Sequence, residues 1–187
     1  MSPILGIWAS QNYPRVTNSY ESIATTTVGS GGSATVTFSS IPSTYTHLQI
    51  RIIGRIDQSN TDDNIYVRFN GDNGANYAGH YFFGTGSTAV AAAAANQNQG
   101  VACRTTGGSS SANIFGVGTC DILDYANTNK NKTVRVLTGH DQNGEGLIFL
   151  MSTLWRNTSA VTSITLFTLA GNMTQYTQLA LYGIKGA

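Results

Sequence analysis

The sequence predicts an all-β protein built as a two-sheet antiparallel β-sandwich, jelly-roll-like, with about ten strands. Apolar and polar residues alternate in short runs along most of the chain, which is the period of a half-buried strand. Turn residues separate these runs at intervals of about 8–20 residues, a spacing typical of sandwiches. Lys occurs three times and Glu twice in 187 residues, so the residues that usually solvate exposed helices are scarce. Long gaps between some runs favour crossing connections, and therefore a jelly roll over an up-and-down barrel.

The first half of the chain contains five predicted strands. In one of them Val36 and Phe38 alternate with threonines, so that one face is apolar. The Asn-Gly pairs at 70–71 and 73–74 accept positive φ and predict a hairpin. The five strands cover 19–28, 34–38, 48–53, 65–69 and 76–83.

The stretch 84–111 consists mainly of Gly, Ala, Ser, Thr, Asn and Gln, so we expect a long excursion there, with one weak strand near Val101. The remaining predicted strands cover 113–125, 133–138, 147–155, 161–169 and 177–184. The apolar residues that alternate in these strands are expected to be mostly core: Phe38, Leu48, Ile50, Ile65, Val67, Phe69, Ile122, Val134, Val136, Phe149, Ile164, Leu166 and Leu181.

Residues 1–18 differ in character from the single sandwich domain predicted for 19–187. Pro3 and Pro14 interrupt any regular element. The segment is also too apolar for a free tail, so we predict an extended N-terminal arm that docks on its own domain or on a neighbouring subunit. Its candidate docking residues are Ile4, Leu5, Ile7, Trp8 and Tyr13.

Charge and cysteine content limit the classes of partner. Charged residues make up 10% of the chain and the net charge is +1, so we expect no nucleic-acid partner, which would require a basic surface. The longest apolar runs are too short to cross a bilayer, so membrane insertion is not expected either. Cys103 and Cys120 do not make a disulfide framework; we expect free thiols, with a bridge as the alternative.

The residues that could hold a metal or carry out catalysis show no strong pattern. His47, His80 and His140 are far apart in sequence and form no ligand pair. A calcium ion could use the oxygens near Asp57, Asp62 and Asp63, although such residues are also usual in solvated turns. The chain has no Gly-x-Ser-x-Gly motif and no phosphate-binding loop. We therefore predict no catalytic, cofactor or metal residues, and a protein that is not an enzyme.

Aromatic residues offer a candidate glycan or receptor surface. Sugar rings have apolar faces and polar rims, which suits aromatic side chains with Asn and Asp nearby. The candidates are Tyr77, Tyr81 and Trp155, with the alternative that aromatic residues in alternating strands belong to the core.

Four stretches together resemble a loose family of small virion structural proteins of tailed bacteriophages. They are VTFSSIPSTYTHLQI at 36–50, VRFNGDNGANY at 67–77, DILDY at 121–125 and LALYGIK at 179–185. The resemblance covers 33–185, while 84–111 departs from the pattern. Family members are jelly-roll-like capsid decoration proteins or tail-fibre and tail-tip modules without enzymatic activity.

The resemblance implies a capsid decoration (cement) protein that forms homotrimers on the capsid surface. Its expected partners are its own copies, the major capsid protein or other virion proteins, and a host surface glycan in the receptor-binding case. Its expected location is the virion, assembled in the host cytoplasm. Two other functions stay open, a tail-fibre or tail-tip receptor-binding module and a carbohydrate-binding β-sandwich. Oligomerisation is expected independently, because the edge strands of a sandwich with so few charges need cover.

Overall fold

The computed structural model describes residues 19–186, so the predicted arm lies outside the described residues. Twelve strands form two antiparallel sheets, which confirms the predicted β-sandwich. The strands of the large sheet are, in spatial order, β1 (Tyr20–Thr27), β12 (Gln178–Ile184), β3 (His47–Gly54), β8 (Gly116–Leu123), β9 (Lys132–Asp141), β10 (Gly146–Trp155), β5 (Tyr77–Gly84) and β6 (Ala89–Gln97). Those of the small sheet are β2 (Thr35–Phe38), β11 (Ile164–Phe167), β4 (Asp62–Phe69) and β7 (Gly100–Thr106).

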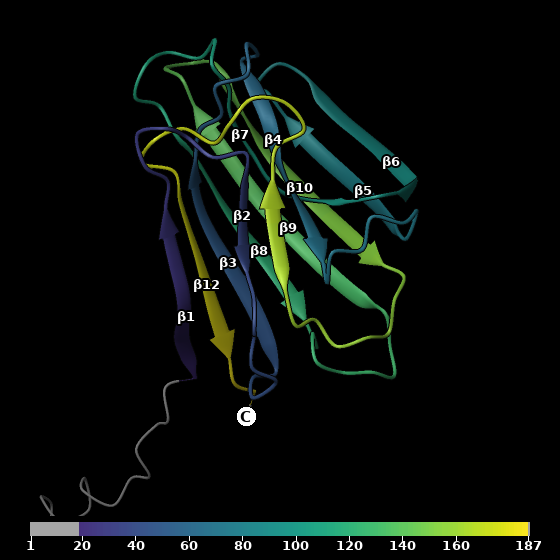
Figure 1. The fold of residues 1–187 in the computed structure, drawn as a ribbon. Coiled ribbons are helices and arrows are strands. Elements are labelled where there is room, and N and C mark those ends of the chain that lie inside the picture. Colours follow the sequence, from purple (N-terminus) through teal and green to yellow (C-terminus); the bar gives the residue numbers. More distant parts are fainter. Residues whose placement is uncertain (1–18, 187) are drawn as a thin grey trace, which may run out of the picture.

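Eight of the strands follow a jelly-roll order. The pairs β1·β12, β2·β11, β3·β8 and β4·β7 are nested one inside the next along the chain, and they alternate between the two sheets. Such nesting is what results when one long antiparallel ribbon is rolled into a double layer. The other four strands, β9, β10, β5 and β6, extend the large sheet beyond β8, so that β6 lies at the edge opposite β1 (Figure 1).

The core lies between the sheets. Every residue predicted for the core is buried, and the most exposed of them, Phe38, has only 5% of its surface accessible. Near one end Phe69, Tyr77 and Trp155 pack together, with the Phe69 and Trp155 ring centroids 5.4 Å apart. Burial of each such large side chain contributes about 1.5–3 kcal/mol to the free energy of unfolding.

Two local expectations need correction. The stretch expected to be a long excursion contains β6 as well as β7, the strand expected near Val101. β6 is rich in alanine, which has a weak preference for strands, and it is held by its antiparallel pairing with β5. Asn70 and Gly71 do have positive φ, at 52° and 69°. They do not form a hairpin, because β4 and β5, which they connect, belong to different sheets.

Cys103 on β7 and Cys120 on β8 are both buried, and neither forms a disulfide within residues 19–186. This agrees with the expectation of free thiols. Burial raises the pKa of the Cys103 thiol to about 12, and it raises that of Cys120 as well. Over the same residues, no helix is long and apolar enough to cross a membrane.

Candidate functional site

The large sheet has an outer face, turned away from the small sheet, on which large apolar side chains are exposed. They come from five neighbouring strands, and between 47% and 67% of the surface of each is accessible. We call the group the outer apolar face: Ile53, Phe82, Val117, Leu137, Ile148 and Leu150.

Strand register brings these side chains into two adjacent rows. In one row Ile53 pairs with Val117, and Gly139 separates Val117 from Ile148. In the other row Leu137 pairs with Leu150, which in turn pairs with Phe82. The face is therefore one contiguous patch rather than scattered apolar residues, and contiguous exposed patches mark interaction sites.

Gly139 leaves the first row without a side chain at its centre, so the patch is hollow there. A hollow of about 620 Å³ is lined by Ile53, Val117, Leu137 and Ile148. A second hollow, of about 490 Å³, shares Val117, Gly139 and Ile148 with it. A glycine inside a strand is typical of places where another backbone approaches closely.

Polar and charged residues border the patch. Asp121 accepts hydrogen bonds from Gln49, at 2.7 Å, and from Arg135, at 2.8 Å. The Arg51 guanidinium lies over the rings of Tyr20 and Tyr182, 5.2 and 5.5 Å from their centroids. Arg51 lines the first hollow, and Asp141 and Glu145 line the second, so charged side chains stand at both ends of an apolar centre.

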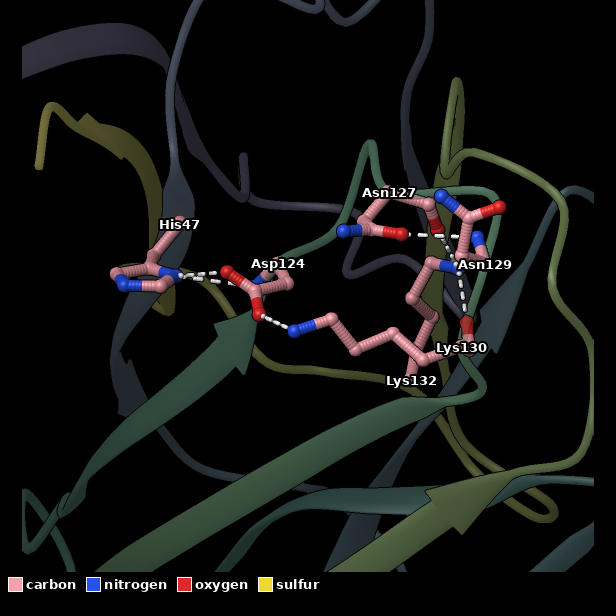
Figure 2. Close-up of polar contacts among 6 residues, drawn as sticks. All are labelled: His47, Asp124, Asn127, Asn129, Lys130 and Lys132. Atoms are coloured by element: carbon pink, nitrogen blue, oxygen red, sulfur yellow. Dashed lines mark hydrogen bonds and ion pairs between the residues drawn. The ribbon is translucent and has the colours of Figure 1, made fainter.

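A separate polar network closes the end of the sandwich at the β8–β9 connection (Figure 2). The Lys132 ammonium is fully buried and donates hydrogen bonds to the carbonyl oxygens of Asn127, Lys130 and Thr158, at 2.7–3.0 Å. Next to it, Lys130 pairs with Asp124. Burial lowers the pKa of Lys132. All three N–H donors of Lys132 are engaged, so it acts as a brace between two loops and is not free to serve as a base.

Asp124 also connects this network to β3. The backbone N–H of Asp124 donates to Nδ1 of His47 at 2.9 Å. The pKa of the Asp124 carboxyl lies below its usual range because Lys130 donates a hydrogen bond to it. These contacts fix the start of the β8–β9 loop.

A second charged cluster lies near the edge of the small sheet. Arg104 on β7 pairs with Asp62 at 2.6 Å, and its guanidinium lies 4.8 Å from the centroid of the Phe83 ring. His140 is close to this pair, and burial lowers the pKa of its imidazole. Both ring nitrogens of His140 are buried without a hydrogen-bond partner among the described residues.

The carboxylates considered for calcium have separate partners. Asp57 accepts from the Asn172 backbone N–H at 2.6 Å, whereas Asp62 is paired with Arg104. Asp63 accepts from the backbone N–H of Asn64. Within residues 19–186, no group of three or more His, Cys, Asp or Glu side chains is placed to hold a metal ion.

Two of the three candidate glycan residues are unavailable to a ligand, which corrects that expectation. Tyr77 and Trp155 are fully buried. The Tyr77 hydroxyl accepts from the Phe69 N–H at 3.0 Å, and Trp155 Nε1 donates to Asp72 at 2.7 Å. Only Tyr81 is partly exposed, and its ring stacks on Phe149 with the centroids 5.5 Å apart.

Sequence reasoning missed the outer apolar face, although the chain carries a signal for it. From 147 to 151 the sequence reads Leu-Ile-Phe-Leu-Met, which is apolar on both faces of a strand rather than alternating. Strands that read this way are usually covered on both sides. The structure covers Leu147, Phe149 and Met151 but leaves Ile148 and Leu150 exposed.

Comparison of the chain with protein families, with curated proteins and with solved structures finds no match.

Proposed function

We propose that the protein is a non-enzymatic structural protein that works by assembly, and that the outer apolar face is its assembly surface. The observation that carries the proposal is the contiguity of six large apolar side chains, each about half exposed, on one sheet face. Covering them would gain about 1 kcal/mol per side chain, or roughly 6 kcal/mol in total before ordering costs. A surface of that kind supports protein–protein contact better than it supports turnover of a polar substrate.

The proposal extends to a class of assembly. The resemblance of four sequence stretches to phage virion proteins supports a capsid decoration protein, a homotrimer bound to the major capsid protein in the virion. A jelly roll is compatible with this class but is shared by many functions, so the fold adds no weight of its own. The low charge content supports it physically, because a surface with few charges responds little to salt and pH.

Copy number tests the proposed class. Quantitative mass spectrometry of purified particles of the phage that encodes the chain should find hundreds of copies per particle. A handful of copies would favour the tail-fibre or tail-tip alternative, and complete absence from particles would refute a virion role. Light scattering on the purified full chain should give about 59 kDa, three times the chain mass of 19.8 kDa.

A further inference from the structure

The middle of the outer apolar face, between Arg51 at one end and Asp141 and Glu145 at the other, suits a narrow apolar occupant. Its two connected hollows measure about 620 and 490 Å³, within the range of pockets that hold small organic molecules, about 300–1,000 Å³. Each has room for an indole ring or a few branched aliphatic side chains. Gly139 at the centre lets the backbone of an incoming segment approach the sheet.

The chain itself contains a segment with these properties, outside the described residues. Ile4, Leu5, Ile7 and Trp8 fall within five positions, and no charged side chain occurs before Arg15. Such side chains gain about 1.5–3 kcal/mol each when they leave water for an apolar site. The segment and the face are therefore complementary in chemistry.

The geometry favours the face of a neighbouring copy over the chain's own face. Register places Tyr20, the first residue of β1, in the row of His47, whereas Thr27 at the other end of β1 lies in the row of Ile53. The chain thus enters the sheet at the end opposite the hollows. Six residue steps along β3, from His47 to Ile53, separate the two rows, which is about 20 Å along the strands.

To reach its own face, the segment would have to reverse direction at once and pass the ridge formed by Tyr20, Tyr182 and Arg51. A neighbour lying ahead of the start of β1 would be reached without a reversal. The twelve residues from Trp8 to Tyr20 span up to about 40 Å when extended. Length alone therefore permits either face, and the direction in which the chain enters β1 is what favours a neighbour.

We infer that residues 3–8 of one copy dock on the outer apolar face of a neighbouring copy. The inference rests on the proposed function, because it requires an assembly of identical chains. Each copy then donates one segment and receives one, and in the proposed trimer this head-to-tail contact closes into a ring. In this arrangement the apolar surface of the segment and that of the face are both covered.

Directed disulfide formation tests the inference in the full chain. Two single-cysteine additions, Trp8→Cys and Ile148→Cys, are made in separate chains with tags of different size and are co-expressed. The native thiols do not interfere, because Cys103 and Cys120 are buried. The matched control pairs Trp8→Cys with Thr37→Cys, since Thr37 is exposed on the small sheet.

We expect a mixed-size disulfide dimer on non-reducing gels for Trp8→Cys with Ile148→Cys, at least tenfold more abundant than for the control pair. Equal yields for the two pairs, or no dimer with Ile148→Cys, would overturn the inference. A chain carrying both Trp8→Cys and Ile148→Cys that links only within itself would also overturn it, because docking would then be intramolecular.

Failure here is distinguishable from failure of the proposed function. A trimer abundant in particles but without the Trp8–Ile148 link leaves the proposed function standing and overturns only the docking site. If the disulfide forms between copies but the protein is absent from virions, the docking site stands and the proposed function is overturned.

Discussion

Ile148→Asp is the sharpest perturbation of the outer apolar face. Ile148 is the most exposed residue of the patch, with 67% of its surface accessible, so replacing it has little effect on the folding of a single chain. Complete burial of an isoleucine is worth about 1.5–3 kcal/mol, and the exposed two-thirds therefore gain about 1–2 kcal/mol on association. Losing this gain lowers the association constant about 5–30-fold per contact. Desolvation of the new carboxylate adds to the loss.

Analytical ultracentrifugation over a dilution series measures the effect, with thermal unfolding as the check on folding. The matched control is Leu169→Asp, because Leu169 is also exposed, at 63%, but lies in the connection between β11 and β12. We expect the assembly of the Ile148 variant to dissociate at higher protein concentration than the wild type and the control. If both variants sediment like the wild type at every concentration, the outer face is not an assembly surface and the reasoning is wrong.

Three further predictions concern groups inside the sandwich. Cys103 and Cys120 should resist a thiol reagent at pH 8 in the native protein and react only on unfolding, because burial raises both pKa values, that of Cys103 to about 12; rapid native labelling measured by absorbance would contradict this. Lys132→Met should lower the free energy of unfolding by about 1.5–3 kcal/mol in urea titrations, since it removes the buried ammonium that donates hydrogen bonds to three loop carbonyls. Lys130→Met, which breaks only an exposed ion pair, should cost less than about 1 kcal/mol. Stability should fall as the pH drops below about 6.5, because burial lowers the folded-state pKa of His140 below its unfolded value and the unfolded chain then binds more protons. His140→Gln should reduce this slope just below pH 6.5, and an unchanged slope would exclude His140 as its source.

The alternating pattern predicted the inner face of the sheets well, because burial between two layers imposes a period of two. Leu48 and Ile50 on β3 and Val134 and Val136 on β9 are buried as expected. The physical cause is local, since neighbouring residues of a strand point to opposite faces. The alternating pattern alone was therefore sufficient to predict the two-layer fold and the core residues.

Features that depend on pairing with distant residues could not be predicted from the local sequence. β6 combines alanines that favour helices with an edge position, and only its register with the aromatic strand β5 makes it a strand. Tyr77 and Trp155 looked like a binding platform in sequence, yet they are buried by packing against Phe69. Neither outcome follows from local composition, because partners far along the chain decide both.

The outer apolar face could not be predicted from the sequence for a different reason. An apolar residue at every position of a strand indicates cover on both faces, but it does not say whether the second cover comes from the same chain. For Leu147 and Phe149 the cover is intramolecular. For Ile148 and Leu150 it is absent from residues 19–186, and this is the observation that turns a folding pattern into an assembly hypothesis.

Four strands added to the jelly roll enlarge one of its two sheets. The eight jelly-roll strands divide evenly between the layers, whereas β5, β6, β9 and β10 all join the large sheet. The four strands of the small sheet cannot cover all eight of the large one, so Tyr81 and Phe83 on the inner face of β5 are only partly buried. β6 is the outermost strand of this extension. It contains nine uncharged residues, and one of its edges is unpaired among the described strands. Charged residues normally protect such edges from pairing with other chains. The strands added to the jelly roll carry four of the six residues of the outer apolar face, Phe82, Leu137, Ile148 and Leu150, and they end in an unguarded edge. Both features are disadvantageous for an isolated chain and advantageous for one that assembles.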